Sequence, residues 1–147
     1  MTGRAAFLAG LRRRPYDPIG FNCWHAASLI QAELFGRALP LVEIEEMGFR
    51  ERVEAFRTHP ERRAWREISA PIDGAFVLMG RARGREHHCG VWLAEGGGRI
   101  WHGDAPHGVI DDRTECHCRD GTTDVDQRPG HGRDGNAVDP GHVIRRQ

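Results

Sequence analysis

The chain has 147 residues, with 21 basic and 21 acidic side chains and therefore a formal net charge of zero. This length is typical of one domain, and the balanced charge excludes the strong positive field that binding to nucleic acid or to anionic lipid needs. No apolar run approaches the roughly 20 residues that cross a bilayer, so we expect a soluble protein without membrane insertion.

The first predicted element is a short helix over residues 3–13, ended by Pro15. Its apolar stretch, residues 5–11, is short and lacks a small-residue cleavage site, so we expect no signal peptide. The four cysteines lack the spacing of a disulfide framework. The simplest interpretation is a protein made in the bacterial cytoplasm with reduced thiols.

A second helix is predicted over residues 23–35, where apolar side chains recur at helical spacing. Asn22 is a suitable N-cap and Gly36 is placed to end the helix. Cys23 then occupies the first turn, where backbone N–H groups and the helix dipole favour a thiolate. This is the electrostatic setting of a nucleophile. A third helix is predicted over residues 43–56.

Beyond the turn at residues 71–74, the texture changes to short apolar runs separated by glycines. These runs predict strands over residues 75–79, 87–94, 99–103 and 108–110, with a hairpin loop at 95–98. Helices followed by strands indicate an α+β domain over residues 1–111, with N-terminal helices packed on a small antiparallel sheet. Residues 112–147 are rich in Gly, Asp and Arg, and we expect a poorly ordered tail held at Val143 and Ile144.

Two of the predicted strands carry histidines, which supply the base and the orienting group that a cysteine nucleophile needs. His87 and His88 lie on the first strand and His102 on the next. Strand alternation puts His87 and His88 on opposite faces and does not choose between them. Asp104 and His107 are alternatives to His102 as the orienting group.

Four motifs occur in order along the chain, at residues 20–24, 71–79, 88–93 and 100–102. This ordered set resembles the NlpC-type family of papain-like cysteine peptidases, which cut the stem peptides of peptidoglycan. The resemblance implies Cys23 as nucleophile, His88 as general base and His102 as the third member of a Cys-His-His triad. It also implies a papain-like fold and no cofactor or metal.

The same resemblance suggests substrate contacts and a setting. Tyr16 matches a tyrosine that lines the family's substrate site, and Asn22 stands where many members have an Asp that receives the free amine of the stem peptide. Trp24 follows the nucleophile, where the family usually has Ser, and is a further candidate for substrate binding. The tract at residues 34–40 is similar to versions found among phage tail proteins, so a virion location and phage tail partners are expected.

Two alternatives to a peptidase remain open. Cys116, His117 and Cys118 are suitable zinc ligands and resemble half of a structural zinc site. The second alternative is a catalytically silent module that keeps the papain-like fold and binds the cell wall or a phage tail.

Overall fold

The computed structural model describes residues 3–40, 42, 48–80, 82, 84–113 and 139–146. Within these ranges the chain forms three α-helices, two short 3₁₀ turns and six strands. The helices are α1 (Gly3–Leu11), α2 (Cys23–Phe35) and α3 (Phe49–Thr58), and the 3₁₀ turns are η1 (Pro60–Ala64) and η2 (Glu95–Gly97). The strands are β1 (Trp65–Glu67), β2 (Ala75–Gly80), β3 (Glu86–Leu93), β4 (Arg99–Asp104), β5 (Gly108–Arg113) and β6 (Asp139–Arg146).

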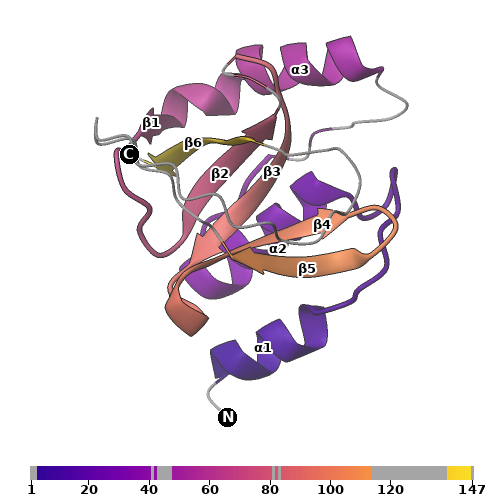
Figure 1. The fold of residues 1–147 in the computed structure, drawn as a ribbon, viewed down its shortest axis with the longest axis vertical. Coiled ribbons are helices and arrows are strands. Elements are labelled where there is room, and N and C mark those ends of the chain that lie inside the picture. Colours follow the sequence, from indigo (N-terminus) through magenta and orange to yellow (C-terminus); the bar gives the residue numbers. More distant parts are fainter. Residues whose placement is uncertain are drawn as a thin grey trace, which may run out of the picture.

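The strands form one antiparallel sheet in the order β1-β6-β2-β3-β4-β5 (Figure 1). From β2 to β5 the chain runs as a simple meander, because each strand pairs with the next one along the sequence. This mixed arrangement confirms the α+β class. The predicted strands at 75–79, 87–94, 99–103 and 108–110 correspond to β2–β5, although β5 continues three residues further, to Arg113.

Helix α2 begins and ends at the residues that the sequence predicts. The Asn22 side chain accepts hydrogen bonds from the backbone N–H groups of Trp24 and His25, at 3.0 and 3.3 Å. At the other end Gly36 adopts a left-handed conformation, with φ of 62°, and its N–H bonds to the Ala32 carbonyl. A residue with a Cβ is strained in that conformation, so glycine is the natural C-cap.

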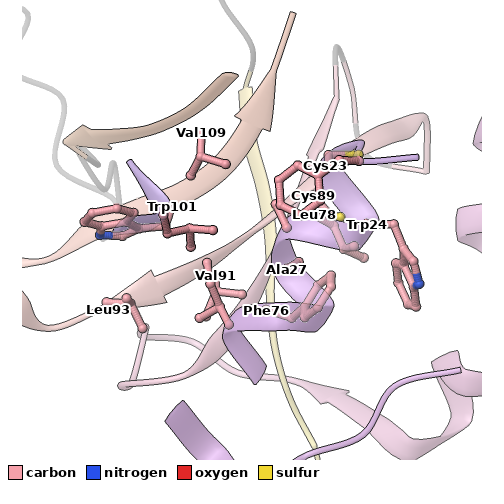
Figure 2. Close-up of a cluster of buried hydrophobic side chains, with 14 of the residues drawn as sticks. Cys23, Trp24, Ala27, Phe76, Leu78, Cys89, Val91, Leu93, Trp101 and Val109 are labelled. Carbon is pink, nitrogen blue, oxygen red and sulfur yellow. The ribbon is translucent and has the colours of Figure 1, made fainter. Parts of the chain in front are cut away.

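The main core lies between α2 and the sheet (Figure 2). Helix α2 packs on β3 and β4, and its residues Ala26, Ala27 and Ile30 are fully buried there. Gly90 of β3 permits a close approach to β4, because a Cβ at this position would lie 2.8 Å from a backbone carbonyl and 3.0 Å from the His102 Cβ. This close contact sets the separation of the two strands that carry the histidines.

Helix α1 is held by the far edge of the sheet and by charged side chains. The Arg13 N–H bonds to the Val109 carbonyl at 2.8 Å, and the Val109 N–H bonds to the Arg14 carbonyl at 2.9 Å. The Arg4 guanidinium donates to both carboxylate oxygens of Asp73, at 2.9 and 2.7 Å. Helix α3 starts at Phe49, and the first part of the predicted helix, residues 43–47, lies outside the described residues.

The end of the chain differs from the expectation of a domain that stops at residue 111. Strand β6 lies inside the sheet, where Val143 and Ile144 pair with Val77 and Phe76 of β2. Backbone hydrogen bonds to two neighbours, β1 and β2, hold this strand, and an apolar pattern does not reveal such pairing. Residues 114–138 of the predicted tail lie outside the described residues. Among the described helices, none is long and apolar enough to cross a membrane.

Candidate active site

Cys23 is the first residue of α2 and lies with its thiol against the sheet (Figure 2). The first N–H groups of a helix have no acceptor within the helix. Asn22 caps those of Trp24 and His25, which leaves the Cys23 N–H as a donor for a ligand next to its own sulfur. The side chain itself is only 5% exposed. The thiol therefore lies at the positive end of a helix and is largely shielded from water.

His88 and His102 come from adjacent strands and are hydrogen-bonded to each other. The Nε2 atom of His88 lies 2.8 Å from Nδ1 of His102, and the two rings are nearly perpendicular. On its other side His102 Nε2 lies 3.0 Å from a carboxylate oxygen of Asp112. His88, His102 and Asp112 thus form a hydrogen-bonded chain. The pKa shifts of Cys23 and His88, each caused in part by the other, place the sulfur at the His88 end of this chain.

The carboxylate at the end of this chain fixes the positions of the protons. An ionised Asp112 only accepts hydrogen bonds, so His102 carries its proton on Nε2 and its Nδ1 accepts from His88 Nε2–H. The Nδ1 atom of His88 is then the one available to Cys23. This arrangement orients an imidazole as a Cys-His nucleophile pair requires.

The electrostatics of the site favour a thiolate. The pKa of Cys23 is lowered well below its ordinary value, first by a hydrogen bond from the Cys89 thiol and then by the hydrogen bond and charge of His88, against the opposing effect of burial. For His88, burial lowers the pKa, but the hydrogen bond and charge of Cys23 outweigh it, so that the pKa is raised. Both shifts favour a thiolate–imidazolium ion pair over the neutral pair.

Cys89 supports this pair without being a second nucleophile. It is fully buried next to Cys23, and burial, followed by the hydrogen bond to Cys23, raises its pKa well above the ordinary value. The raised pKa favours the protonated thiol at Cys89, which can donate toward the Cys23 sulfur. The pKa values of the two cysteines are shifted in opposite directions by their positions in the fold.

The structure brings Cys23, His88 and His102 together, and it places Tyr16 near them. Burial and the charge of Cys23 both raise the pKa of the half-buried Tyr16, which shows that its hydroxyl lies within electrostatic range of the sulfur. Asn22 is only 3% exposed, and its amide serves the helix cap, also donating to the Pro18 carbonyl at 3.1 Å. The amide of Asn22 is therefore committed to the fold.

Trp24 turns away from this site into the core beside α3. Its indole N–H donates to the Pro40 carbonyl at 3.0 Å, and its ring packs against Phe76 and His59. Trp24 is thus a buried neighbour of Cys23. The Trp24 side chain therefore points away from the thiol, and not toward it as a substrate contact at the thiol would require.

The neighbouring candidates fall outside the chain of hydrogen bonds. His87 packs its ring on Phe49, 4.9 Å between centroids, and so lies on the other side of β3 from Cys23. His107 is exposed in the turn between β4 and β5. Asp104 is half-buried and its charge raises the pKa of His88. Sequence reasoning missed Asp112 because the predicted strand stopped at residue 110.

His88, His102 and Asp104 could also hold a metal ion, since one potential ligand atom of each lies within 4.8 Å of the others. Two nitrogen ligands of a tetrahedral zinc, at bond lengths of about 2.0–2.1 Å, lie roughly 3.3 Å apart. The 2.8 Å separation of the two histidine nitrogens is shorter and fits a shared proton. Cys116, His117 and Cys118, the zinc ligands suggested by the sequence, lie outside the described residues.

Comparison with known proteins adds no family to this geometry. No protein-family model matches the chain, and no curated protein matches its sequence.

Proposed function

We propose that this protein is a cysteine peptidase or amidase in which Cys23 is the nucleophile, His88 the general acid and base, and His102 the group that orients His88. The observation that carries the proposal is the hydrogen-bonded chain from His88 through His102 to Asp112, next to a cysteine of lowered pKa at a helix N-terminus.

The reaction follows from these positions. The Cys23 thiolate attacks the carbonyl carbon, and the resulting oxyanion accepts a hydrogen bond from the Cys23 N–H. As the C–N bond breaks, His88 gives its Nδ1 proton to the leaving amine, and a thioester remains. Water then attacks the thioester while His88 takes its proton. The C–S bond breaks, the acid is released, and the thiolate–imidazolium pair is restored.

The substrate class rests on the resemblance to NlpC-type enzymes, which supports a papain-like arrangement and peptidoglycan stem peptides as substrates. Tyr16 would line the substrate site, in keeping with its closeness to Cys23. Association with a phage tail would place the enzyme at the cell wall. No cofactor or metal takes part in the proposed chemistry.

A catalytically silent module is the second candidate, and the burial of Cys23 favours it. A nucleophile that is 5% exposed must gain exposure before a peptide can reach it. In that case Cys23 and the histidines would have no catalytic role, and binding to the wall or to tail proteins would not depend on the thiol.

The deciding experiment is the rate of Cys23 alkylation by iodoacetamide from pH 4 to 9, followed by mass spectrometry, in wild type and His88→Ala. We expect fast labelling well below the ordinary thiol pKa of about 8.5, and slower labelling in the variant at the same pH. His87→Ala is the matched control, because His87 lies away from Cys23. Labelling that follows an ordinary thiol pKa in all three proteins would contradict the proposal and support the silent module.

A further inference from the structure

A pocket lies beside the catalytic residues, between α3, η1 and the β1–β2 side of the sheet. Its volume is about 550 Å³, including its open mouth. Most of the wall is apolar and aromatic, and Trp24 and Phe76, both drawn in Figure 2, form part of it. Phe56, Trp65 and Leu78 complete the apolar lining. Such a wall fits an apolar group that enters from solvent.

Two arginines interrupt this apolar lining, Arg52 from α3 and Arg62 from η1. The Nε atom of Arg52 and one terminal nitrogen of Arg62 are buried without a hydrogen-bond partner. In the described part of the chain no carboxylate pairs with either guanidinium. Leaving a buried charged donor unsatisfied is costly, so this pair of cations is suited to a ligand that supplies acceptors.

The only acidic residue that lines the pocket among the described residues is Glu61, and it is already engaged. Its carboxylate accepts from the Trp65 indole N–H at 2.9 Å and lies 3.5 Å from the guanidinium of Arg146. Glu61 thus leaves the pocket with a net positive lining. An incoming anion would not need to displace an internal salt bridge of Arg52 or Arg62.

The pocket adjoins the nucleophile. Trp24, which forms part of its wall, directly follows Cys23, and Leu78 pairs with Cys89 across β2 and β3. The charge of Arg52 also reaches the catalytic residues, since it lowers the pKa of both His88 and Tyr16. A group bound in the pocket would therefore lie beside the residue that follows Cys23, and its charge would act on His88 through Arg52.

We propose that this pocket is a specificity site for an aromatic or aliphatic group that carries a carboxylate, with Arg52 and Arg62 as the two cationic contacts. The proposal rests on the proposed function for its role in substrate selection, but binding to the pocket does not require the thiol. The proposal requires a substrate with a negative charge next to an apolar group. An apolar group without charge would leave both guanidinium groups unpaired.

The test compares two small probes with the same apolar body, 3-phenylpropanoate and 3-phenylpropanamide. Each is titrated into the full chain carrying Cys23→Ala, so that no covalent chemistry takes part. The indole N–H signals of Trp24 and Trp65 report binding by NMR, because both side chains line the pocket. The signal of Trp92, which packs in a separate cluster with Ile100, serves as the internal control.

We expect the carboxylate to bind at least tenfold more tightly than the amide and to shift the Trp24 and Trp65 signals alone. Arg52→Gln and Arg62→Gln should each remove most of this preference. Arg50→Gln and Arg63→Gln are matched controls, one exposed arginine from the same helix and one from the same turn, and should retain it.

Equal affinity for acid and amide in the unsubstituted pocket would overturn the proposal, as would a preference that survives the loss of both arginines. The absence of any shift at millimolar probe would overturn the pocket as a binding site. Ordinary labelling of Cys23 in the alkylation experiment would instead contradict the peptidase function alone, since these titrations use protein without the thiol.

Discussion

Loss of the hydrogen bond between His88 and His102 should destabilise the thiolate form of Cys23 more than loss of the Asp112 carboxylate does. His102 is buried, and its Nδ1 is the acceptor for His88 Nε2–H at 2.8 Å. In His102→Leu the imidazolium of His88 would keep a buried donor without an acceptor. A hydrogen bond to a charged group contributes about 1.5–3 kcal/mol. The ion pair with Cys23 should weaken by that amount.

This free energy converts directly into a shift in titration. One pKa unit corresponds to about 1.4 kcal/mol, so the midpoint of Cys23 alkylation should rise by about 1–2 pH units in His102→Leu. Asp112 has a side chain that is 64% exposed, and solvent screens its contact with His102. Exposed ion pairs contribute about 0–1 kcal/mol, so Asp112→Ala should shift the midpoint by less than about 0.7 units.

A conservative replacement separates positioning from mere packing. His102→Gln keeps an amide oxygen that can accept from His88, and it should recover part of the shift that His102→Leu causes. The assay is iodoacetamide labelling across pH with mass spectrometry. A midpoint in His102→Leu within about 0.3 units of wild type, or a larger shift in Asp112→Ala than in His102→Leu, would contradict this role of His102.

Two further substitutions probe how the site is built. Cys89→Ala removes the largest contribution that lowers the pKa of Cys23, so the alkylation midpoint should move to higher pH, and an unchanged midpoint would exclude this role for the neighbouring thiol. Gly90→Ala would force a Cβ to within 2.8 Å of a β4 carbonyl and should lower the free energy of unfolding by about 1–3 kcal/mol. Urea denaturation measures that loss, and full stability would show that the strands can separate there without cost.

Local signals in the sequence are strong around α2. Asn22 and Gly36 are residue types whose chemistry fits the two ends of a helix, and the structure uses both as caps. Cys23 is therefore placed at the helix N-terminus by information within a few residues of it. The helix N-terminal position of Cys23 can be predicted in this way, whereas the contacts with Cys89 and His88 that lower its pKa come from β3.

The positions of the other site residues depend on strand register, which local sequence patterns do not predict. His102 pairs with Ile110 and Ile100 pairs with Asp112, so His102 and Asp112 are diagonal neighbours across β4 and β5. A prediction that ends the strand at residue 110 cannot find this carboxylate. Likewise, alternation alone gives no reason to prefer His88 to its neighbour, and only the packing of β3 against α2 decides it.

Strands β1 and β6 show the same limit. Strand β1 has three residues, and β6 follows a long polar stretch, so neither produces a clear periodic pattern. Each is stabilised by pairing with a partner far away in sequence, as Trp65 pairs with Arg146. Long-range backbone pairing of this kind overrides local propensity.

The pocket and the His88 ring should influence each other through Arg52. Its positive charge disfavours the imidazolium form of His88 and so lowers the pKa of that ring. Arg52→Gln removes the charge and should raise the pKa of His88, and a carboxylate bound beside Arg52 should raise it in the same direction. By linkage, the imidazolium form should then bind the carboxylate more tightly than the neutral ring does. The ¹⁵N shifts of His88 measured across pH, with Arg50→Gln as control, test this coupling. A His88 pKa that stays constant in Arg52→Gln would show that the pocket and His88 act independently. A His88 pKa that falls would contradict the expected direction of the coupling.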